Sequence, residues 1–113
     1  MKVYYLDPPV EILDYEKTIG EELVVRERPK HIKAERFYAH FESLAIQDGS
    51  VLLFAIGNGN TVDAAIADYC TKISGKKGQI NIIPQESIGD VAPDFKKDIN
   101  IPGLVYTAQQ EEV

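Results

Sequence analysis

Two asparagines and a threonine lie in a glycine-rich turn at Gly57–Asp63, which the sequence places between a strand and an amphipathic helix. The glycines let the backbone approach a ligand closely, and the first turn of a helix presents unpaired N–H groups at the positive end of its dipole. Phosphate suits such a turn, with Asn58, Asn60 and Thr61 as donors. The alternative is a tight strand-to-helix connection that needs glycine for a positive φ and asparagine for local bonding. The turn matches neither the GxGxxG motif nor a Walker loop.

A cationic strip between Arg26 and Arg36 is the second chemical feature of the chain. It holds Arg26, Arg28, Lys30, Lys33 and Arg36 against only Glu27 and Glu35. A short cationic strip on an acidic protein suits a compact anion better than a long polyanion. The competing interpretation is a solvated surface whose charges pair with the acids upstream.

Aromatic residues follow this strip directly. Phe37 and Tyr38 stand next to Arg36, and a ring beside an arginine suits a nucleotide base and its phosphate, although Phe37 is also a candidate core residue. The predicted ligand-binding residues are therefore Arg26, Arg28, Arg36, Phe37, Tyr38, Asn58, Asn60 and Thr61.

Residues suited to catalysis are sparse. His31 and His40 have no cysteine or second histidine at ligand spacing, and Cys70 falls on the apolar stripe of a predicted helix. The only acid–base pair for an enzyme is His40 with Glu42 on one strand face. The sequence predicts a protein that is not an enzyme, with no catalytic residue, no metal site and no cofactor.

Composition places the chain among small globular proteins. Its 113 residues are 44% hydrophobic and carry a net charge of −6, so we expect one domain over residues 1–113 and no direct binding of DNA or RNA. No apolar run approaches the roughly 20 residues of a membrane span. With one cysteine and no signal peptide expected, the predicted location is the cytoplasm, or the host cytoplasm if a phage encodes the chain.

The secondary structure that must position these residues follows from periodicity. Asp7-Pro8-Pro9 predicts entry into a helix over residues 10–23. Residues 37–44 alternate as a strand, with Phe37, Ala39 and Phe41 on one face. Asp48-Gly49 predicts a hairpin turn, and the returning strand Val51–Ile56 is apolar on both faces, which indicates burial inside a sheet or at a subunit interface.

A second helix is the clearest element. Its apolar stripe is Val62, Ala65, Ile66, Tyr69, Cys70 and Ile73, with Thr61 as N-cap, an Asp68–Lys72 pair and Gly75 as the stop. A strand at Ile80–Ile83 closed by Pro84 follows. The predicted fold is α+β: a small antiparallel-rich sheet with a ββαβ core at about residues 37–84, an N-terminal helix and a frayed tail at 107–113.

Four segments resemble a known family: Phe37–Glu42, Gly57–Thr61, Ala65–Cys70 and Ile73–Lys76. They resemble short accessory proteins from phages of Gram-positive bacteria, and among these the first class of Thoeris anti-defence proteins. The resemblance covers about residues 37–76 and, more loosely, the N-terminal acidic segment that leads to Arg26–Pro29. It implies a non-catalytic sponge that sequesters cyclic ADP-ribose-type signals made by host TIR-domain enzymes, or cyclic oligonucleotides. It also implies a homodimer or a higher symmetric oligomer with pockets that involve the subunit interfaces.

Another class of function remains open. The strand–strand–turn–helix pattern also resembles HicB-like antitoxin domains, and acids gather at the N-terminal side (Glu11, Asp14, Glu21 and Glu22). Such a face could cover a basic, nucleic-acid-handling protein by mimicking nucleic acid. The first hypothesis is therefore a nucleotide sponge, and the alternative is an acidic protein-binding inhibitor or antitoxin module.

Overall fold

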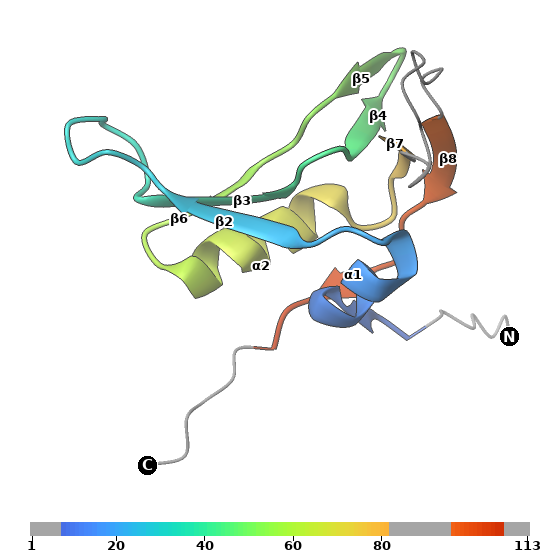
Figure 1. Ribbon diagram of the computed structural model, residues 1–113, viewed down its shortest axis with the longest axis horizontal. Coiled ribbons are helices and arrows are strands. Elements are labelled where there is room, and N and C mark those ends of the chain that lie inside the picture. The colour runs from blue at the N-terminus through green and yellow to red at the C-terminus, as the bar shows by residue number, and fades with distance from the viewer. Residues whose placement is uncertain (1–7, 82–95, 108–113) are drawn as a thin grey trace, which may run out of the picture.

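Two helices and nine short strands make up the part of the chain that this computed structural model describes, residues 8–81 and 96–107 (Figure 1). The helices are α1 (Ile12–Ile19) and α2 (Val62–Ile73). The strands are β1 (Val10–Glu11), β2 (Leu23–Glu27), β3 (Phe37–Phe41), β4 (Ala45–Asp48), β5 (Val51–Leu53), β6 (Gly57–Gly59), β7 (Lys77–Asn81), β8 (Lys96–Asn100) and β9 (Leu104–Val105). The predicted α+β class with antiparallel-rich sheets is confirmed.

A three-stranded antiparallel sheet carries α2 on one face. Its order is β2-β3-β6, with Tyr38 opposite Arg26 on one side and opposite Asn58 on the other. The predicted alternation along β3 is confirmed, because Ala39 and Phe41 are buried beneath α2 while the residues between them face outward. This sheet therefore has one covered face and one open face.

A second antiparallel sheet has the order β5-β4-β7-β8. Its β4–β5 hairpin pairs Asp48 with Val51 across a two-residue turn, in which Gly49 adopts a φ of 61°. The predicted Asp48-Gly49 turn is confirmed, and its positive φ explains the glycine. In Figure 1 this hairpin rises from the end of the first sheet.

The core joins both sheets to the two helices. Phe41 lies at its centre, edge-on to Tyr15 of α1 at 6.4 Å and to Tyr69 of α2 at 5.8 Å between ring centroids. The hydroxyl of Tyr69 also accepts the backbone N–H of Phe41 at 3.0 Å. Buried side chains also come from outside residues 37–84, among them Ile12, Ile101 and Leu104.

The segment predicted as a glycine turn is instead strand β6, which corrects that prediction. Gly57 and Gly59 pair with Ala39 and Phe37, and neither has a positive φ. They are glycines because α2 lies directly against them: a Cβ on Gly57 would stand 2.3 Å from the backbone oxygen of Ala65. The close approach of helix and strand, and not turn geometry, requires glycine here.

The predicted burial of Val51–Ile56 within a sheet is wrong. Only residues 51–53 form a strand, β5, and it is an edge strand with exposed side chains. The cause is a bend after β3, where the Glu21 carboxylate accepts the backbone N–H of Ser43 at 3.0 Å and its hydroxyl at 2.5 Å. This bend sends β4 and β5 into the second sheet, so the elements of the predicted ββαβ core do not share one sheet.

The two ends of the described chain meet in a short parallel pair. Val10 of β1 lies opposite Leu104 of β9, which places α1 beside the C-terminal strand. The predicted N-terminal helix is confirmed as α1, but it is shorter than residues 10–23 because Val10 and Glu11 form β1 and Gly20 ends the helix with a φ of 73°. Asp7, the end of the predicted strand at Ile82–Pro84 and most of the predicted tail lie outside the described residues.

None of the helices in the described ranges is long and apolar enough to cross a membrane.

Candidate functional site

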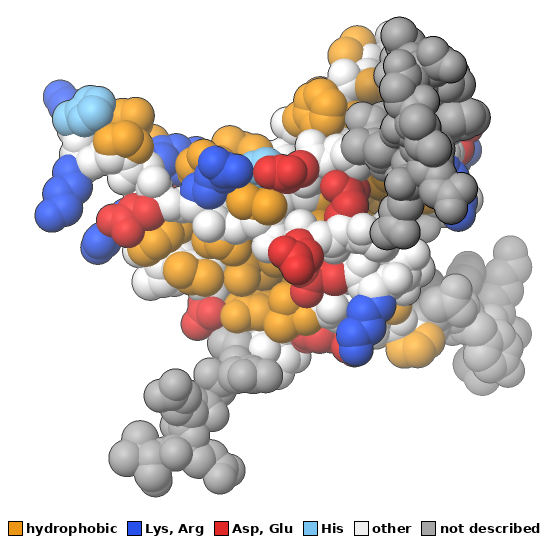
Figure 2. Space-filling view, viewed as in Figure 1, with side chains coloured by type: hydrophobic (Ala, Val, Ile, Leu, Met, Phe, Trp, Pro, Cys, Tyr) orange, Lys and Arg blue, Asp and Glu red, His pale blue; other side chains and the backbone are white. Residues whose placement is uncertain are grey.

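The open face of the three-stranded sheet brings together several predicted ligand-binding residues. Residues that lie opposite each other in an antiparallel ladder share a face, so Arg26, Tyr38 and Asn58 all project away from α2. Figure 2 shows the surface hollowed between the β2–β3 loop and the β4–β5 hairpin, above this sheet. We refer to Arg26, Arg28, Tyr38, His40 and Asn58 as the platform.

Arg28 is the most firmly held cation of the platform. Its guanidinium lies over the Tyr38 ring, 4.8 Å from the centroid, and Nη2 donates to Asn58 Oδ1 at 2.5 Å. Nη1 donates to the backbone oxygens of Glu35 at 2.7 Å and Phe37 at 3.4 Å. These bonds use three of the five guanidinium donors and fix the charge above an aromatic ring.

Asn58 is held from beneath by α2. The carboxylate of Asp68 accepts the Asn58 backbone N–H at 2.8 Å and pairs with Lys72 Nζ at 2.9 Å, as the predicted Asp68–Lys72 pair requires. Partial burial raises the pKa of Asp68, but the bonds from Asn58 and Lys72 outweigh it and hold the pKa below its usual value. A chain of polar contacts thus runs from α2 through Asn58 to Arg28.

His40 extends the aromatic surface of the platform. Its ring stacks on Tyr38, with centroids 5.9 Å apart and planes 3° from parallel. The carboxylate of Glu42 bonds Arg26 at 3.4 Å, between two exposed side chains. The sequence reasoning considered His40 as an acid–base partner of Glu42 or a structural histidine and missed the stack, which the two-residue spacing of Tyr38 and His40 on one strand could have indicated.

Arg36 and Phe37 lie apart from the open face. Phe37 sits opposite Glu27 and Gly59 on the α2 side of the sheet, where it packs half-buried against the core. Arg36 lies 5.3 Å from the Phe37 centroid and pairs with the Glu27 carboxylate at 2.8 Å. Phe37 and Tyr38, which are neighbours in the sequence, therefore lie on opposite faces of the sheet.

A cation-lined hollow of about 280 Å³ lies at the end of the sheet and is lined by both Arg28 of the platform and Arg36. The β2–β3 loop forms it, and the lining residues are Arg28, Pro29, Lys30, Ile32, Ala34 and Arg36. The backbone N–H of Arg28 donates to the oxygen of Arg36 at 2.7 Å, which closes the base of this loop. The lining includes three cations and no carboxylate, so the hollow favours an anion.

Asn60 and Thr61 are engaged within the protein at the start of α2. The Thr61 hydroxyl accepts the Ala64 N–H at 3.1 Å, which confirms Thr61 as the N-cap, and Asn60 Oδ1 accepts the Arg36 N–H at 3.4 Å. These bonds use the acceptor oxygens of both side chains and one N–H of the first turn of α2, and neither uses the Asn60 amide or Thr61 hydroxyl donors that the sequence assigned to a phosphate.

The acids of the N-terminal side are partly structural. Besides the bonds from Glu21 to Ser43, Glu16 accepts the Leu23 N–H at 2.8 Å and Glu11 accepts the Thr107 N–H at 2.8 Å. These carboxylates hold chain segments together, so at least one oxygen of each is already engaged within the protein.

Cys70 is buried on α2, where burial raises the pKa of its thiol to about 11. A thiol of this kind stays protonated at neutral pH and is a poor nucleophile. Within the described ranges, no group of three or more His, Cys, Asp or Glu side chains is placed to hold a metal ion.

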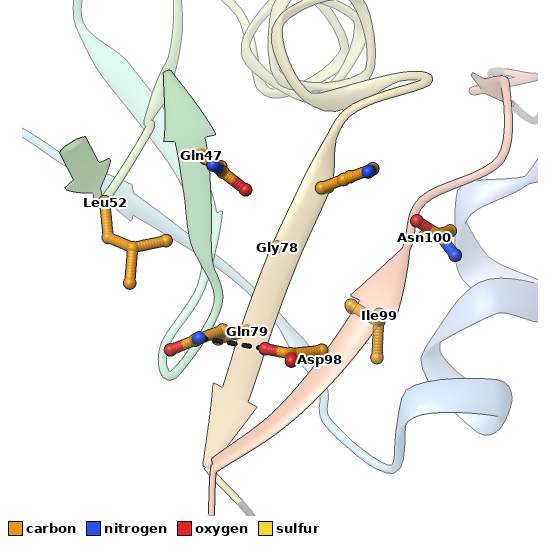
Figure 3. Close-up of a pocket in the computed structure, with 8 residues that line it drawn as sticks. Gln47, Leu52, Gly78, Gln79, Asp98, Ile99 and Asn100 are labelled. Carbon is orange, nitrogen blue, oxygen red and sulfur yellow. Dashed lines mark hydrogen bonds between the residues drawn. The ribbon is translucent and has the colours of Figure 1, made fainter. Parts of the chain in front are cut away.

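A separate polar hollow of about 360 Å³ lies on one face of the four-stranded sheet (Figure 3). Its lining residues are Gln47, Leu52, Lys77, Gly78, Gln79, Asp98, Ile99 and Asn100. Gln79 donates to Asp98 at 2.8 Å across β7 and β8. Sequence reasoning assigned no role to these residues.

Comparisons with known proteins give no relative for this chain: no family model, no curated protein and no solved structure matches it.

Proposed function

We propose that this protein binds and sequesters a small nucleotide with phosphate groups, of the cyclic ADP-ribose or cyclic oligonucleotide kind. The observation that carries the proposal is the meeting of a cation-lined hollow with an aromatic platform at one end of one sheet. Arg28 belongs to both, since it lines the hollow and lies over Tyr38. A phosphate and a base attached to it need these two surfaces side by side.

Each part of the site has a distinct task in this proposal. The Tyr38–His40 stack receives the base, a contact worth about 1–3 kcal/mol. Lys30, the remaining donors of Arg28 and the donors of Arg36 that its bonds to Glu27 leave over bind phosphate through charge-assisted bonds, each worth about 1.5–3 kcal/mol. Because internal bonds already hold Arg28 in place, little conformational freedom is lost on binding.

Holding the ligand without converting it is the activity that this arrangement favours. A hydrolase at the platform would use His40 and Glu42 as its acid–base pair, but the His40 ring stacks on Tyr38 and Glu42 pairs with Arg26. The resemblance to the Thoeris anti-defence proteins supports the same proposal from the sequence.

The decisive experiment is to recover the ligand intact. The purified protein is incubated with a panel of cyclic ADP-ribose isomers and cyclic oligonucleotides, separated from free ligand and denatured by heat, and the released molecules are identified by mass spectrometry. We expect one unaltered species in stoichiometric amount. A cleaved product would show an enzyme, and release of no species from the panel would contradict the proposal.

Matched lysine variants locate the site. Lys30→Ala removes a cation from the hollow, whereas Lys17→Ala removes an exposed lysine from α1 as a control. We expect titration calorimetry to show affinity at least ~10-fold weaker for Lys30→Ala, as for the loss of one charge-assisted bond, and unchanged for Lys17→Ala. Equal affinities in both variants would place the ligand elsewhere.

A further inference from the structure

The edge of the four-stranded sheet at β5 lacks the usual protection. Among the described residues, β5 is hydrogen-bonded only to β4, so one side of the strand presents backbone groups that no described strand pairs. Natural proteins block such edges with lysine, proline or a bulge. The segment 51–56 contains no charged residue and no proline, and β4 and β5 pair residue for residue without a bulge.

The same segment exposes a run of apolar side chains. Their exposed fractions are 59% for Val51, 46% for Leu52, 37% for Leu53, 68% for Phe54 and 36% for Ile56. At roughly 150–200 Å² per fully exposed side chain, about 400 Å² of apolar surface is left in water. That is about half of the roughly 800 Å² that each partner buries in a stable interface. Figure 2 shows hydrophobic side chains gathered over the β4–β5 hairpin and the segment after it.

The ladder directs the backbone of Leu52 outward. Asp48 and Val51 flank the two-residue turn, and bonding in an antiparallel ladder alternates from residue to residue. Gly49, the first turn residue, has the positive φ of a two-residue hairpin, in which the closing pair is hydrogen-bonded to itself, so the N–H and C=O of Leu52 point away from β4. Leu52 is then the centre of the free edge.

We propose that a second copy of this chain pairs with β5, strand against strand, antiparallel about a two-fold axis at Leu52. The two four-stranded sheets then form one continuous sheet of eight strands. A second copy fits because the strip is apolar on both faces, and the two-fold sets Val51 of each copy against Leu53 of the other. In this register the new ladder contains no charged residue, since segment 51–56 has none and Asp48, the nearest charge, lies on β4 across the turn from Val51.

The pairing also has a consequence for the polar hollow of Figure 3. Leu52 lines that hollow together with Gln47 of β4, at the side nearest the free edge. Two copies paired at Leu52 therefore bring their hollows side by side on one face of the joined sheet. The amide and charged side chains of both copies then border one continuous surface.

Two variants at Leu52 test the proposal on the full chain. Sedimentation velocity of the wild-type protein is expected to show a dimer, and Leu52→Lys, which places a charge at the axis, is expected to give a monomer with unchanged circular dichroism. Leu52→Cys is expected to form a disulfide-linked dimer under mild oxidation, because directly opposed residues of a bonded pair have Cα atoms about 5.5 Å apart. Cys70 is buried and does not compete.

Leu13 supplies the matched control, because it is 39% exposed on α1, away from β5. Leu13→Lys should remain a dimer, and Leu13→Cys should not cross-link. A wild-type monomer at every concentration, as expected if another part of the same chain covers β5, overturns the proposal. A dimer that survives Leu52→Lys overturns it as well, as does cross-linking no greater for Leu52→Cys than for Leu13→Cys.

Discussion

Gly57→Ala adds a single methyl group where strand β6 touches α2. The new Cβ would lie 2.3 Å from the backbone oxygen of Ala65, 2.3 Å from the backbone nitrogen of Tyr69 and 2.4 Å from the Tyr69 Cβ. Two of these atoms belong to the helix backbone, so no side-chain rotation can relieve the contact. The helix and the strand must separate instead.

The size of the effect follows from that separation. Ordinary contact begins at 3.4 Å, so the helix must move by about 1 Å (3.4 minus 2.3). Tyr69, which is 0% exposed, moves with it, and a gap of 0.5–1 Å forfeits roughly a quarter to a half of a dispersion contact. Overpacking of this kind costs about 1–3 kcal/mol, and more where backbone is involved. We expect a loss of at least ~3 kcal/mol, out of a total stability of about 5–15 kcal/mol.

Chemical denaturation followed by circular dichroism measures this loss, because the chain has no tryptophan to report by fluorescence. Protein concentration is kept constant, since self-association alters apparent stability. Gly103→Ala is the matched control: a Cβ there meets nothing within 4 Å, and Gly103 has no positive φ. We expect the control to stay within about 1 kcal/mol of the wild type. A Gly57→Ala protein as stable as the control, with an unchanged denaturant slope, would refute the packing argument.

Three further predictions concern α2 and can be checked with the same protein. Tyr69→Phe leaves the buried N–H of Phe41 without its acceptor, so denaturation should show a loss of about 1–3 kcal/mol. Asp68 has a folded pKa below its ordinary 3.8, because the bonds from Asn58 and Lys72 outweigh desolvation, so its ionised form stabilises the fold above that pH. The stability difference between wild type and Asp68→Asn should therefore shrink as the pH falls below about 4; a difference constant with pH contradicts this. Cys70, with its pKa raised to about 11, should react with iodoacetamide at pH 7 far more slowly in the native protein than in denaturant, as peptide mass measurements would show.

Helix α2 could be predicted from the sequence, apart from the burial of Val62, because its determinants are local. The apolar stripe, the Thr61 cap and the stop before Gly75, whose φ is 74°, all lie within the segment itself. The structure places the helix at Val62–Ile73 and confirms each of these features except the burial of Val62, which is 41% exposed. Helical bonds join residues four apart, so a short window contains the information.

The strands were harder to predict than α2, because contacts with residues distant in the sequence determine which strands pair. Apolar residues at 51–56 predict a strand but do not say which neighbour it joins. The bend at Ser43, held by Glu21 from the N-terminal side, separates β4 and β5 from β3. Gly57–Gly59 has poor strand propensity and still forms β6, since its lack of side chains admits α2. No short window contains either cause.

The sequence predicted which residues form the candidate site better than it predicted how those residues are arranged. The sequence put Arg28, Tyr38 and Asn58 in one predicted site, and in the structure they are in mutual contact. It also joined Phe37 to them by adjacency along the chain, whereas neighbours in a strand face opposite ways. Whether these residues bind a nucleotide stays a prediction that the ligand-release experiment decides.

The parallel pairing of β1 with β9 has a consequence for how the chain folds during its synthesis. Val10 leaves the ribosome 94 residues before Leu104 (104 minus 10), so this ladder cannot close until the chain has been synthesised through β9. Until then α1 has no C-terminal strand beside it, although it carries two core side chains, Ile12 and Tyr15. Closing so long a loop costs entropy that only the finished core repays. We therefore expect the docking of β9 against β1 to be a late step of folding.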